Sequence, residues 1–191
     1  MPEETAAPAE VVEWLQDLLD RSFARSSAHL TSIMEPQRRL SAAQLIEDLS
    51  GLAVLSVATV TAAGEPRISA VDGHFLDGRW WFGTSPTAAK ARHLARRPTV
   101  SAAFTPRDGY GVFVHGRARP VALDAAEFEP MRARLVSTYG HGPEGWPEPV
   151  AFFCIDPTWM TAFAMPEAEM AQYAAERAAA VAAATAGPGG A

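Results

Sequence analysis

The sequence predicts an α+β fold in which six mostly antiparallel strands, with helices between them, close into a barrel. Six segments are rich in β-branched and aromatic residues, and helical patterns separate them in the order βββαββαβα. The strongest local signal is Asp77-Gly78, which is typical of a two-residue type I′ turn between neighbouring antiparallel strands. We therefore expect a sheet that begins as an up-and-down meander of three strands.

The predicted strands are short apolar runs bounded by turn residues, and they cover residues 52–61, 66–76, 79–84, 99–105, 110–122 and 150–164. Pro157 lies inside the last of them, where we expect a kink or a bulge because proline cannot donate to a ladder. Helices are expected over 86–96, 123–139 and 167–185. Asp124 is the expected cap of the second helix, whose inner face is expected to hold Phe128, Met131, Leu135 and Val136.

The segment before the first strand predicts a helical N-terminal extension. Apolar residues follow helical spacing from Ala9 to about Met34, and Pro36 is expected to end that helix. A shorter helix is expected from Ser41, a good N-cap, to Asp48. Residues 1–9 are expected to be disordered and residues 187–190 to form a flexible tail. The predicted division is an extension at 1–48, a barrel domain at 49–165, and a C-terminal helix and tail at 166–191.

Composition is that of a soluble globular protein. Of 191 residues, 48% are hydrophobic and 20% charged, and no run of about 18 apolar residues exists that would span a membrane. The acidic start lacks the pattern of a signal peptide, so we expect a cytoplasmic protein without a membrane partner. The single cysteine, Cys154, excludes an internal disulfide and a cysteine-built zinc site, and the histidine spacing matches no metal motif.

Charge is unevenly distributed along the chain. The segment 65–119 holds nine basic and four acidic residues, whereas the whole chain has a net charge of −6. A basic middle between acidic flanks suits a small anionic ligand better than a long polyanion, so we do not expect a nucleic-acid partner. An ordinary solvated face remains the alternative for these basic residues.

A candidate anion site lies where the third strand runs into the first central helix. Ser85 is the expected N-cap and Pro86 the first helical residue, so that the next N–H groups have no partner within the helix. Hydroxyls of Thr84, Ser85 and Thr87 and the ammonium of Lys90 are expected beside them. This arrangement is typical of phosphate binding. The alternative is an ordinary capped helix with an exposed lysine.

The second strand is expected to add a further cation to this site. Strand alternation places Arg67 and Ser69 on one face. A two-residue turn at Asp77-Gly78 predicts that Gly83 lies opposite Asp72 and Thr84 opposite Val71. Arg67 then lies beyond the end of the third strand, near the start of the helix, where it and Lys90 are predicted to reach the same anion. The alternative for Arg67 is an ordinary surface arginine.

Residues 51–164 resemble the FMN-binding split barrels of the pyridoxamine 5′-phosphate oxidase-like group. The matching motifs are Gly64-x-Pro66-Arg67, Asp77-Gly78, Phe82-x-Thr84, Lys90-x-Arg92-x-Leu94, Arg97-Pro98-x-Val100 and Val114-x-Gly116-x-Ala118. The resemblance implies a six-stranded split β-barrel with flanking helices, which forms a homodimer with a flavin at the interface. It also implies that the cofactor contacts are Arg67, Ile68, Ser69, Thr84, Ser85 and Lys90.

Several positions depart from the pattern of the oxidase itself. Asp72 stands where that pattern has a lysine, and Ala88 and Ala89 stand where it has a serine and an arginine. The last strand carries Thr158-Trp159-Met160-Thr161 without the arginine–histidine cluster that grips the vitamin phosphate. The resemblance is therefore to a divergent member, for which FMN is the expected cofactor and a deazaflavin the alternative.

The expected function is that of an enzyme, an FMN- or deazaflavin-dependent oxidoreductase that transfers hydride to or from a small organic substrate. The alternatives are a non-catalytic flavin- or haem-binding barrel for storage or sensing, and a barrel without ligand that acts through its N-terminal helices. No residue is assigned as the acid or base, since His74, His93 and His115 are each expected to be packing or surface residues. Tyr110 and Trp146 lie in or beside predicted loops and are expected to shape a substrate mouth.

Overall fold

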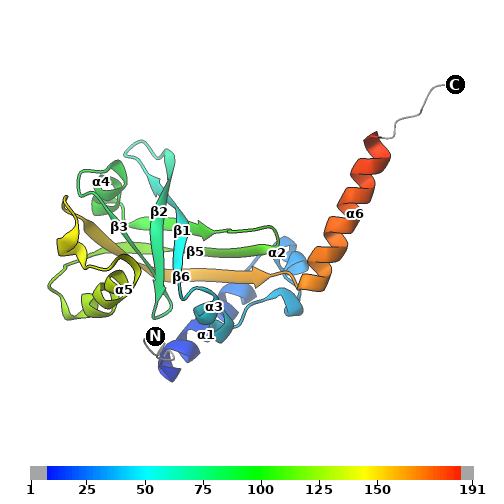
Figure 1. Cartoon of the computed structure of the whole chain (residues 1–191), viewed down its shortest axis with the longest axis horizontal. Helices are drawn as coiled ribbons and strands as arrows, with labels where there is room; N and C mark the ends of the chain where they lie inside the picture. The colour runs from blue at the N-terminus through cyan, green and yellow to red at the C-terminus, as the bar shows by residue number, and fades with distance from the viewer. Residues whose placement is uncertain (1–7, 186–191) are drawn as a thin grey trace.

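The structure, a computed structural model, describes residues 8–185. The predicted disorder at residues 1–9 falls almost entirely outside this range, and the predicted flexible tail at 187–190 lies wholly outside it. The strands form a closed barrel in the order β1-β2-β3-β6-β5-β4, with every neighbouring pair antiparallel (Figure 1). This confirms the predicted α+β barrel.

The six strands match the predicted ones to within one residue at either end. They are β1 (Leu52–Val60), β2 (Pro66–Leu76), β3 (Arg79–Thr84), β4 (Thr99–Phe104), β5 (Tyr110–Val121) and β6 (Ala151–Ala164). The turn between β2 and β3 has positive φ at both central residues, 49° at Asp77 and 73° at Gly78, as a type I′ turn requires.

The strands β2 and β3 separate earlier than the sequence predicts. Their ladder runs from Leu76↔Arg79 to Gly73↔Phe82 in the predicted register and stops there, so the predicted pairs of Asp72 with Gly83 and of Val71 with Thr84 are wrong. The reason is that β2 stays paired with β1 as far as Val60↔Pro66, whereas β3 follows β6 to Thr84↔Ala151. The barrel is therefore split at this point.

The predicted irregularity at Pro157 is a bulge between β5 and β6. His115 pairs with Trp159 and Gly116 with Pro157, so Thr158 has no partner across the ladder. At this bulge the two backbones approach so closely that a Cβ on Gly116 would lie 2.2 Å from the carbonyl oxygen of Asp156. Only glycine fits the position.

The helices are α1 (Ala9–Ala24), α2 (Ala28–Ile33), α3 (Ala42–Asp48), α4 (Ala89–Arg96), α5 (Glu129–Tyr139) and α6 (Glu167–Thr185), with short 3-10 turns η1 (Pro36–Arg38), η2 (Ala126–Phe128) and η3 (Pro143–Gly145). The prediction of one helix over 9–34 is wrong, because the chain breaks between α1 and α2. Ser22 and Ser26 bond back to carbonyls four residues earlier, and Ser27 caps α2 by accepting from the N–H of Leu30. The short helix after Ser41 is confirmed, with a capping box to Gln44.

The helix predicted over 123–139 begins later than expected. Asp124 does not cap it; the chain forms η2 first, and α5 starts at Glu129 with Pro130 in its first turn, where a missing N–H is tolerated. Phe128, Met131 and Leu135 are buried as predicted. Val136 is 47% exposed, so its predicted place on the inner face is wrong.

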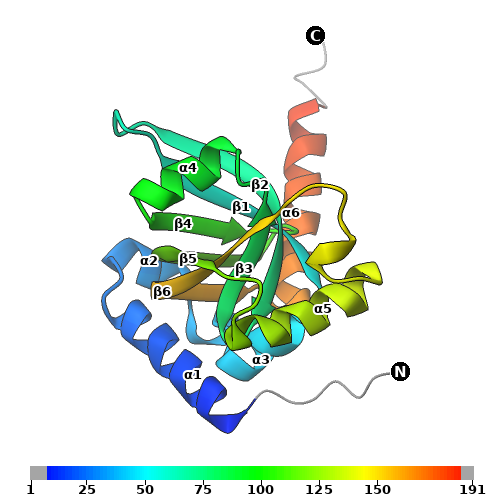
Figure 2. The ribbon, with the colours of Figure 1, turned by 90° about the vertical axis from the view of Figure 1, so that its left-hand side faces the viewer.

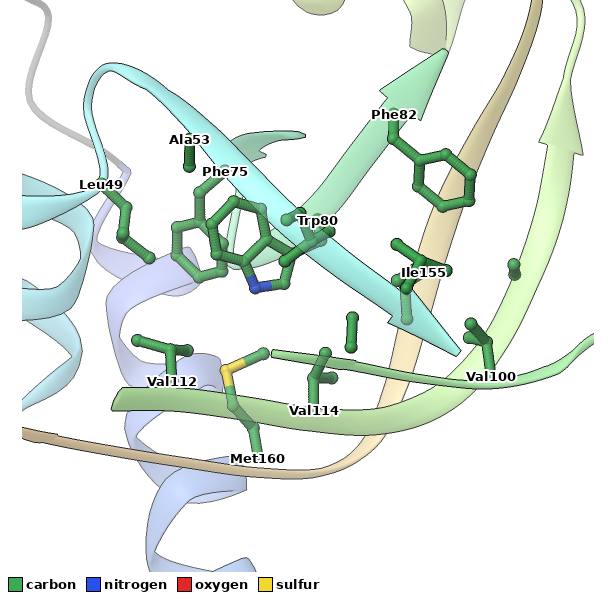
Figure 3. Packing of buried hydrophobic residues seen from close by; sticks show 14 of the residues in the cluster. Leu49, Ala53, Phe75, Trp80, Phe82, Val100, Val112, Val114, Ile155 and Met160 are labelled. Carbon is green, nitrogen blue, oxygen red and sulfur yellow. The ribbon is translucent and has the colours of Figure 1, made fainter. Parts of the chain in front are cut away.

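Two hydrophobic clusters position the site. The first fills the barrel and includes Trp80, Phe82 and Ile155 (Figure 3). It extends to α1, which packs along β6 at one side of the barrel. The second lies outside the barrel wall, where Trp81 and Phe152 pack against η2 and α5. The separation of β2 from β3 opens a space between the sheet and α5.

Candidate functional site

The start of α4 lies three residues later than the sequence predicts. Residues 85–88 form a turn in which the N–H of Ala88 donates to the carbonyl of Ser85 over 3.0 Å, and Pro86 occupies its second position. The helix then begins at Ala89, and its N-cap is Ala88, which has no side chain able to accept a hydrogen bond. The prediction of Ser85 as N-cap is therefore wrong. Its hydroxyl accepts instead from the N–H of Thr87.

Lys90 lies in the first turn of this uncapped helix. Its ammonium donates to Thr84 Oγ1, the last side chain of β3, over 3.3 Å. The N–H groups of the first turn have no acceptor within the helix, and that turn contains no acidic residue. An ammonium and free N–H groups thus share the positive end of a helix dipole, an arrangement that an anion stabilises.

Arg67 lies near the tip of the β1–β2 hairpin, which projects beside α4 (Figure 2). Its guanidinium donates to Glu65 over 2.7 Å, and its side chain is 56% exposed. The residue opposite it on β1, Thr59, is buried and lies 3.0 Å from Nδ1 of His93 on α4. The hairpin is thereby held against the helix that carries Lys90. The structure brings Lys90 and Thr84 into contact, whereas Arg67 contacts a carboxylate.

The remaining predicted contacts on β2 fall on two faces. Ser69 shares a face with Arg67 and is half-buried, as the alternation predicts. Ile68 lies on the opposite face and is 76% exposed. Ile68 therefore lies on the other side of β2 from Arg67 and Ser69.

A pocket of about 270 Å³ adjoins the start of α4, between the split strands and α5. Its polar lining comes from Asp72, His74, Thr84, Ser85 and Tyr139. Its apolar wall is formed by Leu135, Trp146, Val150 and Phe152. Thr84 and Ser85 therefore belong both to the start of α4 and to the pocket.

His74 is the most deeply buried polar group of the pocket, with 2% of its surface exposed. Its Nδ1 has no hydrogen-bond partner within the described residues, and its ring meets that of Tyr139 edge-on at 6.1 Å. Burial lowers its pKa to about 4, helped by Arg134 and opposed by Asp72. The imidazole is thus neutral at neutral pH.

Asp72 and Tyr139 form the second polar feature. The hydroxyl of Tyr139 donates to Asp72 Oδ2 over 2.9 Å. Burial raises the pKa of Tyr139, and the hydrogen bond to Asp72 and its negative charge raise it further. The phenol of Tyr139 is therefore un-ionised at neutral pH and keeps the proton that it donates to Asp72.

The sequence singled out only part of this pocket. Trp146 lines it, but Tyr110, the other residue expected at a substrate mouth, is buried and donates to Asp48 over 3.2 Å. Asp72 and His74 share one face of β2, which alternation alone could have shown. The position of α5 over that face depends on tertiary packing, and no motif announces it.

The hydrogen-bond donors and charges at the start of α4 and in the pocket determine which ligands each place can bind. The start of α4, with its ammonium and free N–H groups, fits a phosphate. The pocket beside it does not, because Asp72 would repel one. Among residues 8–185, no group of three or more histidine, cysteine, aspartate or glutamate side chains is arranged to hold a metal ion. Within the same residues, no helix is both long and apolar enough to cross a membrane.

Solved structures that are similar to this chain share little sequence with it. An FAD-binding protein from Mesorhizobium loti has a TM-score of 0.52 at 20% identity, covering 68% of this chain and 98% of that one. The haem storage protein HutZ from Vibrio cholerae has a TM-score of 0.50 at 19% identity, covering 58% and 86%. A protein of unknown function from Agrobacterium tumefaciens has a TM-score of 0.49 at 18% identity; the match covers 60% of this chain and only 52% of that protein's length.

Sequence comparison gives a more specific result. No curated protein matches the chain. The model of the pyridoxamine 5′-phosphate oxidase family, however, matches residues 42–164, a span that includes all six strands, α4, α5 and the pocket between them. This match covers more than half of the chain, and the FAD-binding protein and HutZ are at most 20% identical to it, so the chain belongs to the pyridoxamine 5′-phosphate oxidase family as a divergent member.

Proposed function

We propose that this protein is a flavin- or deazaflavin-dependent oxidoreductase that holds the phosphate of its cofactor at the start of α4. The observation that carries the proposal is the contact of Lys90 with Thr84 at a helix N-terminus without a side-chain cap. Membership of the family supports a flavin, and a protein of the same fold is described as FAD-binding. FMN is the first choice of cofactor and a deazaflavin the second.

The residues of the chain would divide the work in a simple way. Lys90 and the first N–H groups of α4 would bind the phosphate, as an ion pair and by hydrogen bonds, with Arg67 as a second cation if it leaves Glu65. Thr84 would orient the ammonium. The pocket walls would exclude water from the reacting atoms. When bound, the cofactor itself supplies the capacity to accept or donate hydride.

Absorbance of the purified protein tests the cofactor directly, because flavin, deazaflavin and haem have different spectra. If the protein is purified without a chromophore, titration with FMN and with a deazaflavin should each be followed by the ligand's fluorescence. Saturable binding of either supports the proposal. A haem spectrum would favour the storage or sensing alternative. Absence of binding by all three would contradict the cofactor proposal and leave the fold unaffected.

We also propose that the active form is a homodimer with the cofactor near the subunit interface. The outer faces of β1 and β2 expose apolar side chains that no part of the described chain covers, namely Leu52 (46%), Val54 (66%) and Ile68 (76%). Val54 lies directly opposite Asp72 across the ladder, so this apolar surface borders the pocket. A second copy covering it would also close the site. A small-molecule substrate and a cytoplasmic location complete the proposal, on the ground of the acidic, soluble composition.

A further inference from the structure

The pocket between β2, β3 and α5 is built with the opposite polarity from the start of α4. Its lining contains one formal charge, the carboxylate of Asp72, and no lysine or arginine. Arg134 is near enough to affect the pKa of His74 but does not line the pocket. Lys90, the nearest cation at the start of α4, is directed to Thr84. Among the lining side chains, a ligand therefore meets one carboxylate and no cation.

The hydrogen-bonding groups of the pocket favour a donor. A carboxylate only accepts hydrogen bonds. One oxygen of Asp72 already accepts from the Tyr139 hydroxyl, and the remaining lone pairs of the carboxylate can accept from a ligand. The neutral imidazole of His74 has an Nδ1 without a partner within the described residues. At neutral pH it adds no positive charge, since its pKa is lowered to about 4. Asp72 is therefore the one polar side chain of this lining that can only accept a hydrogen bond.

The walls are aromatic. Trp146 contacts the Tyr139 ring edge-on at 5.8 Å and stacks near Phe152 at 6.1 Å with 23° between the planes. Aromatic faces attract cations through the ring quadrupole, and this attraction is added to that of a nearby carboxylate. Aromatic rings beside one carboxylate are the usual elements of a site for an organic ammonium.

We propose that this pocket binds a small organic amine, with its ammonium at Asp72 and its apolar body against Trp146 and Phe152. The binding does not depend on the cofactor. The further step, that such an amine is the substrate, rests on the proposed function, because Thr84 and Ser85 would then place the amine beside the cofactor.

The test uses three probes of nearly equal size, benzylamine, benzyl alcohol and benzoate, each titrated calorimetrically into the protein without cofactor. We expect benzylamine to bind at least tenfold more tightly than the other two. Asp72→Asn retains an acceptor for Tyr139 but removes the charge, and should weaken benzylamine at least tenfold. Asp108→Asn is the matched control, since Asp108 lies in a different pocket near the start of α6, and it should change nothing.

Benzoate binding as tightly as benzylamine, unchanged affinity in Asp72→Asn, or no binding by any probe would each overturn the proposal. If Asp72→Asn proves unfolded by circular dichroism, Trp146→Leu takes its place, because it preserves the Asp72–Tyr139 pair and removes the aromatic face. It should also weaken benzylamine, and leaving that affinity intact would overturn the proposal too. Cofactor titration is measured separately, so amine binding without cofactor binding refutes the proposed function alone.

Discussion

Thr84 is the residue at which the two parts of the site meet. Its hydroxyl accepts from Lys90, and the same side chain lines the pocket that contains Asp72. A cation and an anion therefore flank one threonine at the end of β3. This separation of charge explains how one short stretch can suit a phosphate on one side and an ammonium on the other.

The first prediction concerns the two cations of the phosphate site. In the double variant Arg67→Ala/Lys90→Ala, the free energy of FMN or deazaflavin binding should become less favourable by about 2 kcal/mol or more, roughly 30-fold in Kd, because two charge-assisted contacts are lost. Fluorescence titration measures the effect. Arg96→Ala is the control, since Arg96 lies at the opposite end of the same helix. Retained affinity in the double variant would place the phosphate elsewhere.

The second prediction concerns His74 and stability. Its pKa is about 4 in the folded protein, against an ordinary value of 6.5, so between these values the unfolded chain binds a proton that the folded chain does not. Above pH 6.5 this difference in pKa does not reduce the free energy of unfolding. As the pH falls toward 4, the free energy of unfolding decreases by about 3 kcal/mol because the unfolded chain takes up the proton first. Urea unfolding across this range should show a shallower decline for His74→Leu than for the wild type. Parallel profiles would contradict the assignment.

At the scale of elements, the β2–β3 hairpin connects the barrel to the N-terminal extension. Gly78 has φ of +73°, and a Cβ there would lie 2.6 Å from the Trp14 ring on α1. The guanidinium of Arg79 lies over the same ring at 4.5 Å. The turn that fixes the register of β2 and β3 is therefore in contact with α1. The N-terminal extension packs directly on this hairpin.

The third prediction uses two glycines with the same backbone requirement. Gly64, at φ of +83°, has open space around its would-be Cβ, whereas Gly78 has Trp14. Gly64→Ala should lower the free energy of unfolding by about 1 kcal/mol through backbone strain alone. Gly78→Ala should cost about 1–3 kcal/mol more, because the Trp14 ring must move. Equal losses in chemical denaturation would show that α1 does not restrain the turn.

Elements fixed by local signals were predictable, and those set by tertiary packing were not. Asp77-Gly78 specifies its turn by itself, and the strand bounds follow from alternation and turn residues. The start of α4 was predicted three residues early, because Ser85 and Pro86 suit a β-turn as well as a helix start. Lys90 and Thr84 still meet as expected, because the ammonium reaches back to the end of β3 from the first turn of the helix that forms.

The pocket shows the limit of sequence reasoning more sharply. His74 reads as one lone histidine, and Asp72 only as a departure from a family pattern. Their meaning depends on α5, which brings Tyr139 within 2.9 Å of Asp72 from 67 residues away. It also depends on the early separation of β2 and β3, which a hairpin register cannot reveal because each strand's other neighbour decides it.

At the scale of the whole molecule, the helices within residues 8–185 leave part of the outer surface of β1 and of the first half of β2 uncovered. Val54 on β1 and Ile68 on β2 are exposed there. Further along β2, α5 lies against Asp72 and His74, and α1 packs along β6 (Figures 1 and 2). Exposure of these apolar side chains to water is unfavourable, and their burial against a second copy of the chain would stabilise a dimer. Val54 is paired with Asp72 between β1 and β2, so this exposed surface adjoins Asp72.

The last prediction follows from that continuity. The wild-type protein should be a dimer by light scattering coupled to size-exclusion chromatography, and Val54→Asp/Ile68→Asp should shift it to monomer, because two carboxylates would be buried unpaired. Val136→Asp, a similarly exposed apolar position on α5, should remain dimeric. If the cofactor lies at the interface, the monomeric variant should also bind FMN or deazaflavin less tightly while unfolding cooperatively. A wild-type monomer that binds cofactor at full affinity would show instead that one chain completes the site.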